Sequence, residues 1–144
     1  MPSITIGWKE RIDLPDLNLR RVKAKIDTGA RTSALCAVYY VMRDASDGRH
    51  MVEAELVLRR KWPNRRVKIV LPVIGTVVVK NSGGQRELRP VIETRIRLGP
   101  VTKPVRFTLT DRSHMLVPLI LGRRALNCDF VVDTSQKYLH KTSH

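Results

Sequence analysis

Short stretches in which apolar and polar residues alternate dominate the chain, and no stretch longer than about ten residues keeps the 3.6-residue period of an amphipathic helix. Residues 91–98 are an example, because Arg95 and Arg97 alternate there with apolar residues, as in a strand with one solvated face. The chain is also rich in β-branched residues, which favour strands. The pattern therefore predicts a mainly β protein.

Turn signals rich in Gly, Pro, Asn and Asp separate the predicted strands, at residues 47–48, 62–64, 81–84 and 98–100. We expect strands at residues 3–8, 20–26, 34–42, 51–59, 66–70, 77–80, 90–98, 105–110, 118–121 and 130–133. One short helix is expected at residues 123–126, directly after Gly122. Many short strands with frequent turns indicate a small barrel or sandwich.

Length and composition restrict the class of protein. The chain has 144 residues, so we expect a single domain over residues 1–144. Hydrophobic residues make up 42% of it, which excludes a disordered basic tail. No apolar run approaches the roughly 18 residues that a membrane helix needs, and residues 1–8 lack the layout of a signal peptide. We therefore expect a cytoplasmic protein with no membrane association.

The charge balance points to an acidic partner. The chain has 27 Lys and Arg against 13 Asp and Glu, a formal net charge of +14. Such an excess attracts polyanions over long range, and nucleic acid is the first candidate. Aromatic residues are only 5% of the chain, which argues against a base-stacking platform, and no nucleic-acid-binding motif is present. The net charge alone therefore predicts an acidic partner but does not indicate its chemical class.

The most informative tract is residues 25–35, where an apolar-ending strand runs into Asp27-Thr28-Gly29-Ala30. A carboxylate in this position lies exposed at the end of a strand. The Thr28 hydroxyl can fix neighbouring backbone, and Gly29 permits a tight turn and close approach of a ligand. By itself the tripeptide Asp-Thr-Gly is weak evidence for a functional site, because an ordinary Asx turn explains it equally well.

A second tract, residues 117–126, is an apolar strand closed by Gly122-Arg123 and followed by the short helix. The early Ile-Asp-Thr-Gly-Ala paired with this late Gly-Arg resembles the single-domain aspartic proteases of the retropepsin type. More narrowly, residues 26–35 and 115–126 look like a bacterial family of retropepsin-like proteins that carries the name ATP-dependent zinc proteases. The resemblance covers most of the chain.

The resemblance implies a small closed acid-protease barrel and an aspartic peptidase that is a homodimer. It also implies an oligo-glutamate substrate, since the chain is similar to the peptidase that acts with a glutamate ligase for a ribosomal protein. Aspartic proteolysis needs two carboxylates that share one proton, and two such like charges cannot both ionise. One Asp27 from each of two chains would make the pair. In the family, the C-terminal segment forms an edge strand at the dimer interface, which suits residues 130–133.

A rival Asp-Thr occurs at Asp133-Thr134. We reject an intrachain pair, because 144 residues cannot supply two protease lobes. No metal and no cofactor are expected. The histidines are scattered, Cys36 and Cys128 form no metal-spaced cluster, and no phosphate-binding loop is present, so we treat the words zinc and ATP as inherited names.

The chain departs from the retropepsin pattern in ways that suggest roles for particular residues. Viral retropepsins commonly carry an acidic residue two positions after the first Gly, paired with the late Arg, but here that position is Arg31. We therefore expect Arg31 and Arg123 to face one another near the groove and to bind substrate carboxylates. Gly83 and Gly84 would form the tip of a flap that closes over substrate, although a plain hairpin turn explains the same residues.

Two hypotheses of different classes remain. The first is a homodimeric aspartic endopeptidase that cleaves acidic, glutamate-rich peptide segments, with Asp27 as its catalytic residue and Thr28, Gly29 and Ala30 shaping the loop. The second is a non-catalytic basic β-barrel that binds ribosomal RNA or a ribosomal protein through its arginines. Ribosomal association is compatible with both.

Overall fold

The structure is a computed structural model of the whole chain, and it describes residues 3–59, 64–80, 83–111 and 117–140. Strands dominate it, as predicted, and one short helix, α1 (Arg123–Leu126), follows Gly122. The strands are β1 (Ile4–Gly7), β2 (Lys9–Leu14), β3 (Leu19–Ile26), β4 (Ser33–Asp44), β5 (His50–Arg59), β6 (Arg65–Pro72), β7 (Gly75–Lys80), β8 (Arg86–Leu98), β9 (Val101–Thr110), β10 (Leu119–Leu121) and β11 (Phe130–Asp133). A 3₁₀ turn, η1 (Pro15–Leu17), joins β2 to β3.

The strand pairing closes a barrel. Within the described residues, neighbouring strands run in the order β10, β3, β2, β8, β9 and β4, and β4 pairs again with β10. Both edges of β10 are therefore paired, one with β3 and the other with β4, so the ring has no free edge at that point. This confirms the small closed barrel that the sequence predicted.

Strand β2 is missing from the sequence prediction, which had one strand over residues 3–8 and nothing over residues 9–14. The reason is that two acidic side chains of β2, Glu10 and Asp13, are buried rather than solvated. Glu10 accepts hydrogen bonds from the backbone N–H groups of Gly7, Leu139 and His140. Buried carboxylates satisfied in this way break the alternation on which a sequence prediction depends.

Inward-facing side chains of the ring form the core. The largest of them, Phe107, is fully buried together with Ile12, Ile92 and Leu119 from other strands of the ring. In the second half of β3 the burial alternates, so Val22, Ala24 and Ile26 face inward and the two lysines between them face water. Strand β3 ends at Ile26 at the rim of the barrel, and Asp27 is the next residue.

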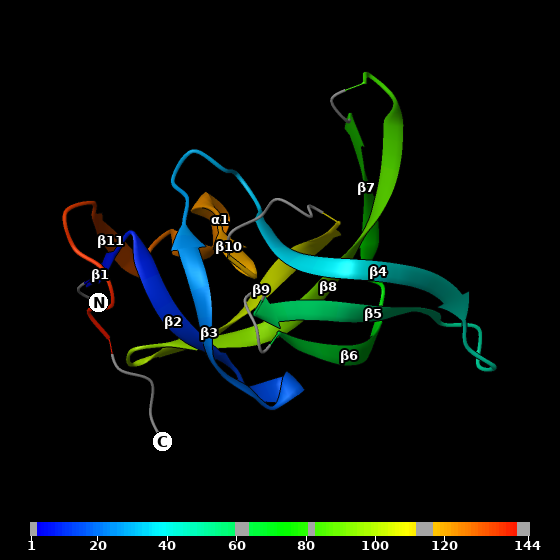
Figure 1. Cartoon of the computed structure of the whole chain (residues 1–144), viewed down its shortest axis with the longest axis horizontal. Helices are drawn as coiled ribbons and strands as arrows, with labels where there is room; N and C mark the ends of the chain where they lie inside the picture. Colours follow the sequence, from blue (N-terminus) through cyan, green and yellow to red (C-terminus); the bar gives the residue numbers. More distant parts are fainter. Residues whose placement is uncertain (1–2, 60–63, 81–82, 112–116, 141–144) are drawn as a thin grey trace.

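Two hairpin extensions leave the ring. Strands β5 and β6 continue outward from β4, and β7 pairs with the first half of β8 in register from Gly75–Val91 to Lys80–Arg86. Figure 1 shows the β7–β8 hairpin standing away from the barrel above the other strands. At the opposite side of the molecule, β1 and β11 form a separate parallel pair. Among the described residues, no helix is long and apolar enough to span a membrane.

Candidate active site

Asp27 lies directly after β3, at the rim of the barrel. Its backbone N–H donates to the carbonyl oxygen of Leu121 at 2.9 Å, and Ile26 is paired with Leu121 in the parallel β3–β10 ladder. The aspartate is therefore fixed by the late apolar strand, although the two segments lie far apart in the sequence. Its side chain is half-buried.

The loop after Asp27 is an Asx turn. The N–H of Gly29 donates to Oδ1 of Asp27 at 3.0 Å, and the N–H of Ala30 donates to the Asp27 carbonyl oxygen at 3.2 Å. A Cβ at position 29 would lie 3.3 Å from Oδ1, so a side chain there would crowd the carboxylate. Thr28 and Gly29 are exposed. These bonds fix the direction of one carboxylate oxygen and leave the other accessible.

Gly122 locks the late Gly-Arg motif against the Asp27 loop. Its N–H donates to Oγ of Ser33 at 3.0 Å, and the N–H of Arg123 donates to the Ala30 carbonyl oxygen at 2.8 Å. A Cβ at position 122 would overlap the carbonyl of Thr32 and lie 2.9 Å from the Ala30 carbonyl oxygen. Only glycine allows this close approach of two backbones.

The side chain of Arg123 forms hydrogen bonds with the backbone of the same loop. Its Nη1 donates to the carbonyl oxygens of Thr28 at 3.1 Å and Gly29 at 3.2 Å. Arg31 is exposed, and its carbonyl oxygen accepts from the N–H of Arg124. The sequence-based expectation placed Arg31 and Arg123 together around a substrate carboxylate, but the described cavity beside Asp27 is lined by neither of them. In this structure Arg123 holds the loop backbone.

That cavity has a volume of about 320 Å³ and lies between the Asp27 loop and the β7–β8 hairpin. The loop contributes Asp27 and Ala30, β7 contributes Val77 and Val79, and β10 contributes Ile120. The paired strands of the hairpin therefore form one wall of the cavity that Asp27 lines. Asp27 is the only acidic residue among the described lining residues.

Arg89 of β8 also lines the cavity, with Thr108 and Thr110 of β9. The Arg89 side chain is only 12% exposed. The sequence analysis did not single out this arginine. No local signal distinguishes it from Arg86 or Arg95, because its burial depends on how β8 pairs with β7 and β9.

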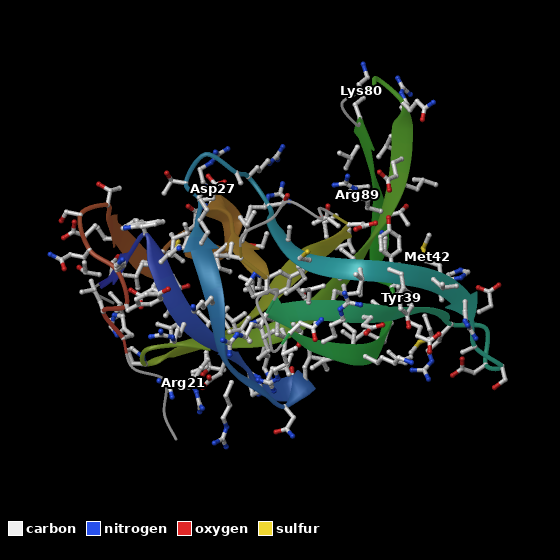
Figure 2. All side chains as sticks on the ribbon, viewed as in Figure 1. Arg21, Asp27, Tyr39, Met42, Lys80 and Arg89 are labelled. Atoms are coloured by element: carbon white, nitrogen blue, oxygen red, sulfur yellow. The ribbon has the colours of Figure 1, made fainter. Side chains whose placement is uncertain are left out.

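Gly83 and Gly84 lie in the turn of the β7–β8 hairpin and are exposed. Gly84 has φ of +80°, a left-handed conformation that favours glycine. Neither glycine lines the cavity. Figure 2 shows Lys80 near the far end of the hairpin and Arg89 near its base, on the side of the molecule that also carries Asp27.

The rival aspartate, Asp133, lies at the end of β11, opposite Gly7 of β1. Hydrogen bonds from the hydroxyl and N–H of Ser135 lower the pKa of the Asp133 carboxyl. Asp133 does not line the cavity beside Asp27. Strand β11, expected at an intersubunit edge, pairs in parallel with β1 of its own chain.

Among the described residues, no three His, Cys, Asp or Glu side chains gather in a way that could hold a metal ion. Cys36 is buried and Cys128 is exposed, and neither forms a disulfide within the described residues.

A closed barrel whose Asp-Thr-Gly loop is locked by a strand ending in Gly-Arg defines the retropepsin-like class of aspartic proteases. Comparison with known families agrees: the model described as "Retropepsin-like aspartic endopeptidase RimB" matches residues 5–143. The chain belongs to this RimB-like family.

Curated relatives carry a different name. A "Probable alpha-L-glutamate ligase" from Desulfotalea psychrophila is 33% identical over 128 residues, covering 89% of this chain and 27% of the relative. One from Shewanella pealeana is 36% identical over 137 residues, covering 92% of this chain and 29% of the relative. The chain thus spans less than a third of the length of these proteins.

A solved structure extends the comparison. The protein Lpg0085 from Legionella pneumophila, described as of unknown function, superposes with a TM-score of 0.77 at 27% identity. The match covers 97% of this chain and all of that one. The two proteins therefore share the overall fold.

Proposed function

We propose that the protein is an aspartic endopeptidase that works as a homodimer and cleaves acidic, glutamate-rich peptide segments. The observation that carries the proposal is the position of Asp27, held by β10 and the Gly122–Arg123 turn at the mouth of a cavity under the β7–β8 hairpin. The RimB-like family is named for this class of activity.

The chemistry requires a second carboxylate. One aspartate takes a proton from water as the water attacks the peptide carbonyl, and the other, protonated, polarises that carbonyl. The described residues around the cavity supply one aspartate. Asp27 of a second copy would complete the pair across a two-fold axis.

Two features support an acidic substrate. The net charge of +14 would steer an acidic peptide to the protein, and Arg89 places a guanidinium on the wall of the cavity that Asp27 also lines. The curated relatives are named as glutamate ligases and are much longer than this chain. A glutamate-containing product of such a ligase is a natural substrate for a peptidase of the same family.

The test uses the purified full chain with a glutamate-rich peptide, and mass spectrometry to detect products. We expect cleavage by the unchanged chain, loss of at least about 10³-fold in kcat/KM for Asp27→Asn, and little change for the matched variant Asp133→Asn. The affinity of Asp27→Asn for the peptide should be nearly unchanged. If Asp133→Asn were as inactive as Asp27→Asn, the assignment of Asp27 would fail.

Mixing the unchanged chain with Asp27→Asn tests the dimer. If each active site needs two Asp27 side chains, activity falls with the square of the unchanged fraction once subunits have exchanged. A linear fall would mean that one chain suffices. A chain that binds acidic partners but never cleaves them would favour the non-catalytic basic barrel instead.

A further inference from the structure

Arg89 and Thr110 form an unfilled polar site inside the cavity that contains Asp27. Both residues line that cavity. Nε of Arg89 and Oγ1 of Thr110 are buried and have no hydrogen-bond partner among the described residues. Thr110 as a whole is only 2% exposed. Buried polar atoms are almost always paired, so two unpaired ones in one cavity indicate a partner from outside the chain, such as water or a bound ligand.

The strand register places the two side chains on the same face. Val91 of β8 lies opposite Thr108 of β9 in the antiparallel ladder. Arg89 lies two residues before Val91, and Thr110 lies two residues after Thr108, so both side chains point to the side that Thr108 occupies. Across the hairpin, Arg89 is paired with Val77, which lines the same cavity.

The only ion-pair partner of Arg89 among the described residues is a poor one. Nη2 of Arg89 lies 3.4 Å from Oε2 of Glu87, a carboxylate whose side chain is 44% exposed. Charge-assisted hydrogen bonds of good geometry are about 2.7–2.9 Å long. Glu87 therefore leaves most of the donor capacity of the guanidinium unused, including the buried Nε.

The Glu87 carboxylate has a second contact, made through its other oxygen. The hydroxyl of Tyr40 donates to Oε1 of Glu87 at 3.3 Å. Burial, together with the Glu87 carboxylate, raises the pKa of the Tyr40 phenol, which therefore stays a neutral donor. Glu87 can therefore keep its hydrogen bond with Tyr40 when another carboxylate replaces it at the Arg89 guanidinium.

We propose that Arg89 and Thr110 form a subsite that binds the side-chain carboxylate of a glutamate in the substrate, next to the bond presented to Asp27. The Arg89 guanidinium and the Thr110 hydroxyl each donate to this carboxylate, and Glu87 occupies the guanidinium in the empty state. The subsite rests on the proposed peptidase function and specifies how that site selects its substrate. The specificity is for a carboxylate over an amide of the same shape.

The test measures binding of two labelled peptides, oligo-glutamate and oligo-glutamine, to the full-length Asp27→Asn chain, in which turnover is stopped. Both peptides have amidated C-termini, so only side chains carry carboxylates. Arg89→Gln should weaken oligo-glutamate binding about 10- to 100-fold and leave oligo-glutamine binding unchanged. If a free C-terminal carboxylate is the true ligand, both peptides will bind in an Arg89-dependent way, and only when they are not amidated, which would overturn the side-chain assignment.

Three further variants separate recognition from general charge and from folding. Arg106→Gln removes the same charge from an exposed arginine of β9 that is outside the cavity, and should cost less than about 3-fold. Thr110→Val keeps the shape of the side chain and should cost several-fold. Glu87→Gln removes the competing carboxylate and should tighten oligo-glutamate binding, an effect that structural damage would not produce.

The outcomes distinguish the subsite from the peptidase activity. Equal losses for Arg89→Gln and Arg106→Gln, or no preference for oligo-glutamate in the Asp27→Asn chain, would overturn the subsite. If the unchanged chain cleaves glutamate-rich peptides but Arg89→Gln keeps the same preference, the subsite fails and the peptidase stands. If no peptide is cleaved but binding of oligo-glutamate depends on Arg89, the peptidase fails and the subsite stands.

Discussion

The guanidinium of Arg123 donates to the carbonyl oxygen of Gly29 at 3.2 Å, so a residue near the C-terminus holds the loop that carries Asp27. The same Nη1 reaches the carbonyl oxygen of Thr28. Because Arg123 is exposed, these bonds contribute more to the position of the loop than to the stability of the fold.

Arg123→Gln should therefore lower kcat/KM for a glutamate-rich peptide by about 10- to 100-fold, because the Asp27 carboxylate loses its fixed position. The melting temperature should change little. Amide hydrogen exchange at Gly29 and Ala30 should become faster, a readout that does not depend on turnover. The control is Arg124→Gln, because the Arg124 side chain is exposed and makes no hydrogen bond to another described residue. Equal effects of the two variants would contradict a positioning role.

Gly122→Ala should destabilise the fold by about 1–3 kcal/mol or more, because the new Cβ would meet the Thr32 and Ala30 carbonyls. Chemical denaturation measures the change in the free energy of unfolding. Gly75→Ala is the matched control, since a Cβ there meets nothing within 4 Å. That variant should stay within about 0.5 kcal/mol of the unchanged chain. If Gly122→Ala left the free energy of unfolding unchanged, the backbone at Gly122 and the backbone at residues 30–32 could separate without cost.

Glu10→Gln should also destabilise the protein, because the buried carboxylate accepts from the N–H groups of Gly7, Leu139 and His140. An amide has one oxygen in place of two, so at least one buried N–H loses its acceptor, at a cost of about 1–3 kcal/mol. Because Glu10 joins the N-terminal strands to the C-terminal segment, limited proteolysis should cut first near residues 136–140. Cleavage that begins elsewhere would show that Glu10 does not secure this segment.

Asp16 should contribute to stability in a pH-dependent way. Hydrogen bonds from the side chain and N–H of Arg95 lower the pKa of the Asp16 carboxyl below its ordinary 3.8. A lowered pKa in the folded state stabilises the fold above the ordinary value, and this gain is lost as the pH falls through the folded-state pKa. Asp16→Asn should therefore melt slightly earlier than the unchanged chain at neutral pH and at the same temperature in strong acid. A difference that persists in acid would have another origin.

The strand pattern of this protein could largely be predicted from its sequence, because most strands have one face in the core and one in water. Strand β3 shows this clearly, with Val22 and Ala24 buried between exposed residues. Strand β2 could not be predicted, because Glu10 and Asp13 face inward and are satisfied by backbone N–H groups and Arg97 from elsewhere in the chain.

The Asp27 loop and the Gly122–Arg123 turn could also be predicted from the sequence, because turns and strand ends depend on the residue types of a few consecutive positions. The sequence could not decide which arginines face the cavity. Arg31, Arg89 and Arg123 are alike as residue types, but strand pairing makes Arg89 the one of these three that lines the cavity containing Asp27. The sequence determined the Asp-Thr-Gly motif and the class of fold, whereas the tertiary structure decided which arginine lines the cavity with Asp27, because burial depends on contacts between distant segments.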